Sequence, residues 1–392
     1  MNVIEKSVWP QFTEEEAQAV ADIVRSNQVN YWTGQVSRAF EREFANWVGS
    51  AYAVALANGT LALDVALKAL GIAAGDEVIV TPRTFIASVS CVVNAGAVPV
   101  FADVERDSGN ISPATIAPLI TERTRAIIPV HLAGWPCDMD GIMALAAQHD
   151  LAVIEDCAQA HGAMVGARRV GSIGHVGAWS FCQDKIMTTG GEGGMVTTND
   201  GALWSSMWSF KDHGKSWEAM YECEHAPGFR WVHESFGTNW RMLEMQAAIG
   251  RIQLGRMAEW TDRRTAIAAR LTEALAHHPE VVRVPTPAAG LRHAYYRLYA
   301  YVRPEGLAEG WSRDRIVSSL REAEVQVLHG TCPEVYLEKA FEGTPWRPKE
   351  RLPNARELGE TSLMFLTHPT MGDAELDRAV GAIDRVLSSA LG

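Results

Sequence analysis

The spacing of apolar and polar positions predicts that strands and helices alternate along the first half of the chain. Short runs rich in valine and isoleucine have the length and composition of buried strands. Segments of roughly ten residues, with apolar positions three and four apart, separate these runs and are typical of helices. The predicted strands cover residues 51–56, 77–81, 98–104, 125–132 and 151–156, and the predicted helices about 60–70, 84–94, a stretch near 115, and 140–148.

This order favours an α/β fold with a doubly wound, mostly parallel sheet that has helices on both faces. Ahead of the first strand, Thr13 and Glu16 form the pattern of a capping box and begin a further helix. We predict a large α/β domain over residues 1–250 that includes this N-terminal helical segment. A long helical tract, a proline-rich break near Pro287, a strand at 295–302 and helices at 312–322 and 373–391 predict a smaller C-terminal α+β domain over residues 251–392.

The composition narrows the possible functions. The chain has 392 residues, of which 47% are hydrophobic, and its net charge of −12 disfavours binding to nucleic acid or to an anionic membrane surface. The apolar runs are much shorter than the roughly 18 residues of a membrane-spanning helix. Six cysteines without a C-x-x-C pair argue against a zinc site and a disulfide framework, so we expect no metal site. The acidic N-terminus lacks the pattern of a signal peptide, which predicts a cytoplasmic protein.

Lys185 is the first candidate for chemistry. It lies in the segment AWSFCQDKIMTTGGEGGMVTT, residues 178–198, between two apolar runs and beside a loop with four glycines. A primary amine next to a loop that can approach a ligand closely is suited to forming a Schiff base. The alternative is an ordinary solvated lysine beside a flexible hairpin loop.

Other candidates follow the predicted strands, where ligands bind in doubly wound sheets. Gly59 and Thr60 begin a helix after the first strand, and free backbone N–H groups and a hydroxyl there suit a phosphate; a simple turn with an N-cap is the alternative. Asp156 ends the strand 151–156 and could pair with a protonated pyridine nitrogen, or its carboxylate could be satisfied by nearby backbone N–H groups.

Two further residues complete an ordered set. Ser180 precedes Lys185 by five residues and could share the phosphate site, and Phe85 could stack on a flat cofactor or be a core residue. Taken together, the set offers partners for the phosphate, ring face, ring nitrogen and aldehyde of pyridoxal phosphate. Its members are Thr60, Phe85, Asp156, Ser180 and Lys185.

Several segments resemble the DegT/DnrJ/EryC1/StrS family. They include IEDCAQAHGA, WSFCQDKIMTTGGEGGMVTTND, ANGTLALDVALKALGI, GDEVIVTPRTF and FGTNWRMLEMQAAIGRIQL, and the resemblance extends to about Leu254. The family consists mainly of pyridoxal-phosphate sugar aminotransferases, and the resemblance implies the aspartate-aminotransferase fold, known as fold type I. The chain differs from the family at Arg83, where small or apolar residues are expected, in its extra glycine in TTGGEGG, and in the segment HGTCPEVYLEKAF.

The resemblance also implies roles for individual residues. Lys185 would carry the cofactor as a Schiff base and later move the proton between cofactor and substrate, while Asp156 would hold the pyridinium. Gln159 matches the position against the cofactor 3-hydroxyl, and Phe85 matches the ring-stacking position. The positions that match the phosphate cup are Gly59, Thr60 and Ser180.

Two residues near the start of the long helical tract are implied to act as well. Asn239 matches an asparagine that reaches the phosphate from the partner subunit, which implies a homodimer with shared active sites. Arg241 is a candidate for binding the carboxylate of the amino donor, because a guanidinium group binds carboxylates well. A structural ion pair is the alternative for Arg241.

The expected function is a two-stage transamination. An amino donor, expected to be glutamate, aminates the cofactor, which then aminates a keto group of a nucleotide-linked deoxysugar for polysaccharide, O-antigen or glycoside biosynthesis. The alternatives are a sugar dehydratase with the same cofactor, in which a histidine replaces the lysine, and a noncatalytic ligand sensor. The sequence leaves open the nucleotide, the sugar, the aminated carbon and a cyclitol acceptor.

Overall fold

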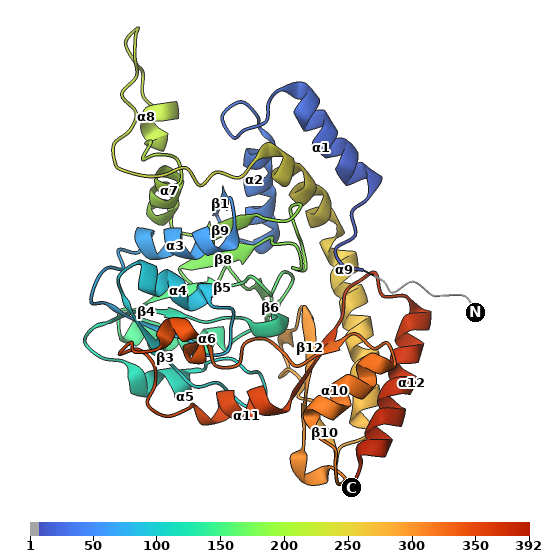
Figure 1. Ribbon diagram of the computed structural model, residues 1–392. Helices are drawn as coiled ribbons and strands as arrows, with labels where there is room; N and C mark the ends of the chain where they lie inside the picture. The colour runs from blue at the N-terminus through green and yellow to red at the C-terminus, as the bar shows by residue number, and fades with distance from the viewer. Residues whose placement is uncertain (1–7) are drawn as a thin grey trace.

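A seven-stranded sheet forms the centre of the fold in the computed structural model, which describes residues 8–392 (Figure 1). In order across the sheet its strands are β1 (Tyr52–Leu56), β9 (Gly194–Thr198), β8 (Val176–Ser180), β5 (Ala152–Asp156), β4 (Thr124–Ile128), β2 (Glu77–Val80) and β3 (Val98–Phe101). β9 is antiparallel to both of its neighbours, and the remaining pairs are parallel. The prediction of a mostly parallel sheet is therefore confirmed.

Helices cover both faces of this sheet (Figure 1). The helices of the first part of the chain are α1 (Glu14–Ser26), α2 (Val36–Val48), α3 (Gly59–Ala69), α4 (Ala87–Asn94), α5 (Pro113–Ile116), α6 (Met139–Gln148), α7 (Gly201–Phe210) and α8 (Trp217–Tyr221). Side chains alternate between two hydrophobic cores along each strand: Ile79 lies in one, and its neighbours Val78 and Val80 lie in the other. This period of two with both faces buried explains the continuous apolar runs in the sequence.

The C-terminal part forms a second, smaller layer of antiparallel strands and helices. Its sheet has the order β10 (Val282–Arg283), β12 (Arg297–Val302), β14 (Ser362–Leu366) and β13 (Val327–Leu328). Its helices are α9 (Glu244–Ala276), α10 (Arg313–Glu322) and α12 (Asp373–Ala390). Strand β12 and helices α10 and α12 lie within two residues of their predicted bounds. The predicted domain boundary between residues 250 and 251 falls inside α9, which continues through it.

One C-terminal segment returns to the large sheet. Val335 and Tyr336 belong to the same hydrophobic core as Phe101 of β3, and the Val335 N–H donates to the Pro82 carbonyl at 2.8 Å. Helix α11 (Pro353–Thr361) follows, and the N–H groups of Asn354 and Ala355 at its start donate to the Asp103 carboxylate just after β3. The short remaining elements are β6 (Met164–Val165), β7 (Arg168–Arg169), β11 (Leu291–Arg292), and the 3₁₀ turns η1 (Ala117–Leu119), η2 (Leu132–Gly134), η3 (Pro304–Gly306), η4 (Val335–Leu337) and η5 (Lys339–Phe341). The two layers are thus joined by more than α9.

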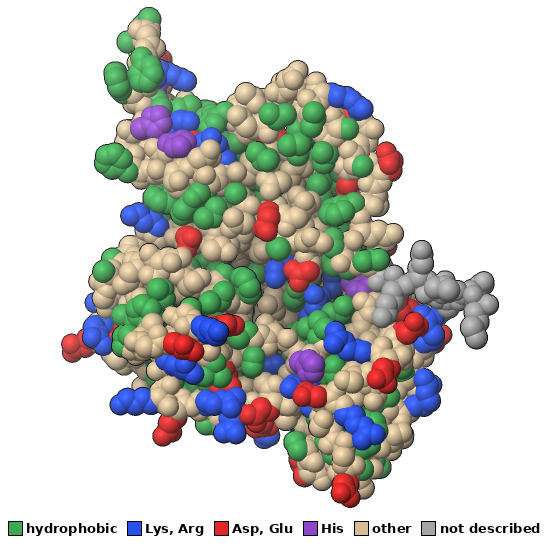
Figure 2. Space-filling model, viewed as in Figure 1, with side chains coloured by type: hydrophobic (Ala, Val, Ile, Leu, Met, Phe, Trp, Pro, Cys, Tyr) green, Lys and Arg blue, Asp and Glu red, His purple; other side chains and the backbone are tan. Residues whose placement is uncertain are grey.

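An arm, residues 222–238, projects from the body of the molecule between α8 and α9 (Figure 1). It carries three large aromatic side chains in contact with solvent: Phe229 is 76% exposed, Trp231 85% and Phe236 100%. Figure 2 shows hydrophobic side chains gathered on this projection. An apolar surface of this kind on a protruding segment is typical of a contact with another protein surface.

All six cysteines are free within residues 8–392, and three of them, Cys91, Cys137 and Cys157, are buried. No helix in this part of the chain has the length and apolar composition required to cross a membrane.

Candidate active site

A cleft of about 750 Å³ lies between the large sheet and the small one. Strands β1, β2, β5 and β8 end at this edge of the large sheet, whereas β12 and β14 contribute the opposite wall. Because the carboxyl ends of these strands meet here, residues far apart in the sequence converge. Seven of the predicted site residues line the cleft, namely Gly59, Thr60, Phe85, Asp156, Gln159, Ser180 and Lys185.

Lys185 lies in the loop between β8 and β9, and its side chain is only 16% exposed, unlike that of a solvated surface lysine. Its backbone is held on both sides: the N–H donates to the Cys182 carbonyl at 3.1 Å, and the carbonyl accepts from Trp9 Nε1 at 2.7 Å. The amine is 3.9 Å from Asp184 Oδ1 and 5.3 Å from the ring centroid of Tyr296. The loop therefore presents a single amine to the cleft in a fixed place.

The glycines after Lys185 form a tightly packed turn. Gly190 and Gly191 have φ values of +88° and +124°, a region that favours glycine. A Cβ on Gly193 would lie 2.0 Å from Thr189 Oγ1, and that hydroxyl donates to the Glu192 carbonyl at 2.6 Å. Close backbone packing and left-handed conformations, rather than flexibility, account for the glycine content of this loop.

Asp156 ends β5 with its carboxylate in the cleft and is 6% exposed. Its Oδ2 accepts a hydrogen bond from Ser88 Oγ at 2.7 Å, and Ser88 is in turn 2.8 Å from Thr84 Oγ1. Its Oδ1 accepts from the Ala158 N–H at 3.1 Å. These bonds fix the direction of the carboxylate. Both hydroxyl residues line the cleft, and the sequence prediction did not include them.

The N-terminus of α3 forms one end of the cleft. Asn58 caps this helix by accepting from the Leu61 N–H at 3.0 Å, and Thr60 in its first turn is exposed. A Cβ on Gly59 would lie 2.5 Å from the Cβ of Ser180, so only glycine allows the end of β8 to approach the helix. Free N–H groups, the positive end of the helix dipole and two hydroxyls are suited to a phosphate.

Phe85 and Gln159 lie on the walls between these groups. The Phe85 side chain is 65% exposed, which a core phenylalanine would not be, and it lines the cleft. Gln159 Oε1 accepts from the Ala133 N–H at 2.7 Å, which orients its amide group. An exposed aromatic face and a fixed amide are suited to contacts with a flat ring and its substituents.

A polar cluster that the sequence prediction did not include joins the two walls: Asp184 comes from the β8–β9 loop of the large domain, and Tyr296 and Arg297 come from the small-domain wall. The Tyr296 hydroxyl donates to the Asp184 carboxylate, and Arg297 Nη2 lies 3.5 Å from Asp184 Oδ2. Burial alone would raise the pKa of Asp184, but the nearby Lys185 amine, the Tyr296 hydroxyl and the Arg297 guanidinium outweigh it and lower that pKa. Burial also raises the pKa of Tyr296, so its hydroxyl keeps its proton.

Asn239 and Arg241 do not line the cleft of the described chain. Asn239 is exposed where the arm meets the body, and its backbone pairs with that of Asp212. Arg241 Nη1 donates to Asp212 Oδ1 at 2.7 Å, and Lys215 Nζ lies 3.2 Å from the same oxygen. Within one chain Arg241 is therefore part of a structural ion pair, while a contribution of Asn239 to a second chain stays a prediction.

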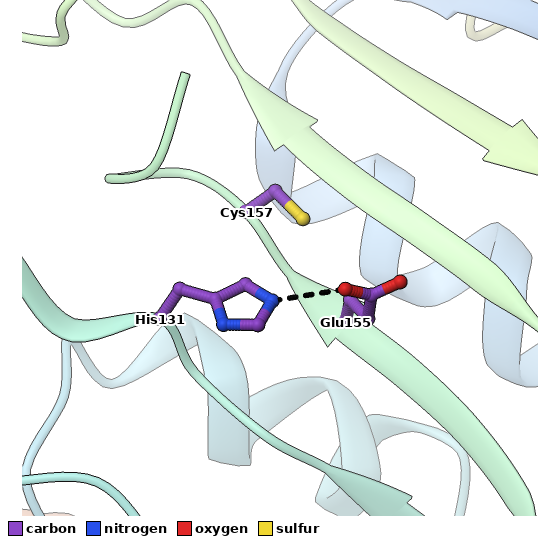
Figure 3. Close-up of side chains that lie close together, drawn as sticks. All are labelled: His131, Glu155 and Cys157. Carbon is purple, nitrogen blue, oxygen red and sulfur yellow. Dashed lines mark hydrogen bonds and ion pairs between the residues drawn. The ribbon is translucent and has the colours of Figure 1, made fainter. Parts of the chain in front are cut away.

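His131, Glu155 and Cys157 lie close together and buried around the end of β5, in a grouping that resembles a metal site (Figure 3). The ligand atoms of His131 and Glu155 are already engaged, because Glu155 accepts from His131 Nε2 at 3.0 Å and from the N–H groups of residues 171, 173 and 174. His131 Nδ1 accepts from the Cys137 N–H at 3.0 Å. Burial alone would raise the pKa of Glu155, but these hydrogen bonds and His131 lower it. The hydrogen bonds of Glu155 connect the end of β5 to His131 and to residues 171–174.

Comparison with known proteins identifies the family. Residues 10–384 match the DegT/DnrJ/EryC1/StrS aminotransferase family. The chain belongs to this family. A GDP-perosamine synthase of Caulobacter vibrioides is 36% identical over 365 residues, 91% of this chain and 92% of that protein. A dTDP-3-amino-3,4,6-trideoxy-alpha-D-glucose transaminase of Streptomyces venezuelae is 34% identical over 378 residues, 96% of this chain and 93% of that protein.

The fold is also that of a solved aminotransferase. The X-ray structure of an aminotransferase from Psychrobacter cryohalolentis superposes with a TM-score of 0.97 at 61% identity, covering 98% of this chain and 100% of that one. The protein is therefore an aminotransferase that uses pyridoxal phosphate. The predicted family, fold class and cofactor are confirmed.

The residues of the cleft fit this cofactor. The α3 terminus with Gly59 and Ser180 suits the phosphate, Asp156 suits a protonated ring nitrogen, and Lys185 supplies the amine for the aldehyde. When bound, pyridoxal phosphate supplies an electron sink that makes a proton on the neighbouring substrate carbon removable.

Proposed function

We propose that this aminotransferase transfers an amino group from glutamate to a keto group of a nucleotide-linked deoxysugar, and that it works as a homodimer. Two relatives support the sugar, since one is a GDP-perosamine synthase and the other is a transaminase of a dTDP-amino sugar. The observation that carries the proposal is the Lys185 amine, held inside a cleft whose other residues fit pyridoxal phosphate.

The side chains of the cleft divide the work. Two donors bind the oxygens of Asp156 and orient its carboxylate, which would hold a proton on the ring nitrogen of the bound cofactor. The Lys185 amine lies where it can take a proton from the substrate carbon and return it one position away. Asp184, held by a hydrogen bond from the Tyr296 hydroxyl, keeps a negative charge beside this amine. The identity of Lys185 separates transamination from the dehydratase alternative, which uses a histidine there.

The size and lining of the cleft support a substrate larger than an amino acid. Its volume of about 750 Å³ lies in the upper part of the range for drug-sized ligands. Polar groups gather around Lys185, while Leu328 and Met364 contribute an apolar wall from the small sheet. A nucleotide-linked sugar suits such a mixture of polar and apolar surface.

The arm supports the homodimer. Phe229, Trp231 and Phe236 expose apolar area that a second copy of the chain would cover, and Asn239 lies at the base of the arm. In a two-fold dimer the same surface is used on both copies, so each arm would reach its partner. Light scattering during gel filtration measures the mass: a dimer that dissociates when Phe229 and Trp231 are both replaced by serine is the expected result. A wild-type monomer would contradict it.

The reaction is tested with a panel of keto-sugar nucleotides, each supplied with glutamate. The expected result is release of 2-oxoglutarate together with an amino sugar nucleotide for at least one member of the panel. Loss of a sugar hydroxyl without 2-oxoglutarate would favour the dehydratase. Cofactor binding without turnover of any substrate would favour a ligand sensor.

A further inference from the structure

Among the described residues that line the cleft, Arg297 is the one arginine, and Lys185 is the other basic residue. Arg297 begins β12, on the small-domain wall, and its side chain is 12% exposed. Arg241, the arginine proposed from the sequence to bind the donor carboxylate, is engaged with buried Asp212 outside the cleft. Arg297 therefore occupies the position in which a guanidinium group can meet a substrate.

The contacts of Arg297 hold its side chain in place, but they leave its guanidinium group able to bind a substrate carboxylate. Its guanidinium carbon lies 3.9 Å from the ring centroid of Tyr296, and Nη1 donates to the Tyr296 carbonyl at 2.8 Å. Its carboxylate partner is Asp184, at 3.5 Å from Nη2, and the Asp184 side chain is 55% exposed. A long ion pair with a half-exposed partner contributes little stability, so another carboxylate can replace it at small cost.

Asp184 also shows that a carboxylate fits between the two cations. One of its oxygens is 3.9 Å from Lys185 Nζ, and the other is 3.5 Å from Arg297 Nη2. An α-amino acid that reacts in this cleft brings its nitrogen to the place of the Lys185 amine. Its carboxylate carbon is two bonds from that nitrogen, which puts its oxygens in the same region. The internal carboxylate thus marks the place of an external one.

We propose that Arg297 binds the carboxylate of the amino donor and that Asp184 is the counter-ion it releases when the donor enters. This inference rests on the proposed transamination. After the donor leaves as an oxo acid, Asp184 returns and neutralises the guanidinium, and the sugar enters beside an internally paired cluster. One cleft can then receive a charged amino acid and a sugar in turn. The alternative is that Arg297 binds a carboxylate carried by the sugar substrate instead of the carboxylate of the amino donor.

Measuring the two half reactions separately distinguishes a carboxylate on the amino donor from one on the sugar. Arg297→Gln loaded with pyridoxal phosphate is mixed with glutamate, and the rate of loss of the Schiff-base absorbance is followed. The glutamate concentration for half-maximal rate should rise on the order of 10- to 100-fold, because a charged hydrogen-bonding partner is lost, while the maximal rate changes little. The same variant loaded with pyridoxamine phosphate should react with the keto-sugar nucleotide as the wild type does.

Arg283→Gln is the matched control. Arg283 also stacks on a tyrosine, with its guanidinium carbon 4.8 Å from the Tyr301 ring centroid, and it pairs with Asp107, but it lies outside the cleft. Neither half reaction should change in this variant. Arg297→Lys keeps the charge without the forked geometry, and its glutamate requirement should lie between those of the wild type and Arg297→Gln.

A binding measurement completes the test without turnover. Glutarate carries two carboxylates and no amine, so calorimetric titration into the pyridoxal-phosphate form reports carboxylate binding alone. Arg297→Gln should bind glutarate at least roughly 10-fold more weakly than the wild type and Arg283→Gln. Circular dichroism identifies a variant that has not folded, in which case Arg297→Lys carries the comparison.

Several results would overturn the inference. Unchanged glutarate affinity in Arg297→Gln, a defect confined to the sugar half reaction, or a raised glutamate requirement in Arg241→Gln alone would each assign the carboxylate elsewhere. Failure of the proposed function is distinguishable, because the wild type itself would then aminate no keto sugar. If the wild type transaminates and Arg297→Gln keeps its glutamate dependence, only the role of Arg297 is wrong.

Discussion

The two walls of the cleft are built in different ways. On the large-domain wall, Asp156 is 6% exposed and bonded through both oxygens, and Gly59 and Ser180 approach too closely to admit a methyl group. On the small-domain wall, the carboxylate pair of Arg297 is long, and its partner is the half-exposed Asp184 of the facing β8–β9 loop. A wall with little freedom suits a cofactor that stays through every cycle, and a wall with exchangeable contacts suits substrates that differ between half reactions.

Replacing Lys185 with alanine should have the largest effect, because its amine both carries the cofactor and moves the proton. Transamination should fall by at least the roughly 100- to 10,000-fold that a positioned proton-transfer group contributes. The Schiff-base absorbance should disappear, while thermal unfolding of the cofactor-free protein stays nearly unchanged. A variant that retained both the absorbance and full activity would show that the large-domain wall does not hold the reacting amine.

Gly59→Ala tests how little freedom the large-domain wall has. The added methyl group would meet Ser180 at 2.5 Å, so we expect a loss of about 1–3 kcal/mol in the free energy of unfolding and weaker cofactor binding. Gly255→Ala is the control, because Gly255 is exposed in α9 with no atom within 4 Å of its added Cβ; it should gain about 0.5–1 kcal/mol. Urea unfolding measures both values, and equal effects would contradict the packing argument.

The pH dependence of stability should show a smaller effect at Asp184, which contacts the small-domain wall through Tyr296 and Arg297. The folded protein lowers the pKa of Asp184 below its usual value of 3.8, so the ionised group stabilises the fold above pH 3.8 and loses this contribution as the pH falls further. Because the group is half exposed, Asp184→Asn should cost only about a few tenths of a kcal/mol near neutral pH. Urea unfolding at several pH values should show this difference shrinking in acid.

Asp377→Asn serves as the comparison for Asp184→Asn, since Asp377 is an exposed partner of Arg270 on the surface of α12. A difference for Asp184→Asn that grows as the pH falls would mean that its carboxylate is destabilising in the fold, and the cluster of Asp184, Tyr296 and Arg297 would need another explanation.

The sequence predicts the large-domain wall better than the small-domain wall. The residues of the large-domain wall are marked by local strand patterns, whereas those of the small-domain wall are set by contacts between distant segments. Asp156 and Ser180 end apolar strands, and parallel strands bring their carboxyl ends to one edge wherever they lie in the chain. Tyr296 and Arg297 are adjacent residues in the run AYYRLYA, in which no local pattern indicates which side chain faces the cleft. Pairing of β12 with β14 and packing of the small layer against the large one decide that.

Other omissions have the same origin. Ser88 bonds to Asp156 across 68 positions, a contact that a helix with buried apolar neighbours does not reveal. The return of Val335 and Tyr336 to the core around Phe101 likewise depends on tertiary packing. Helix ends, by contrast, follow from local signals: Ser312 caps α10 by accepting from the Arg315 N–H at 3.2 Å, and Thr13 and Glu16 make the predicted capping box.

Helix α9 gives the molecule a mechanical link. Its 33 residues span about 50 Å, from the glycine turn to the far side of the small layer. Near its start, Gln246 donates to the Glu192 carbonyl at 2.8 Å, and Gln253 accepts from the Thr188 N–H at 2.8 Å. These two hydrogen bonds connect the first part of the helix to the turn that follows Lys185. A rotation of the small layer that carried α9 with it would therefore shift the backbone turn next to the Lys185 amine.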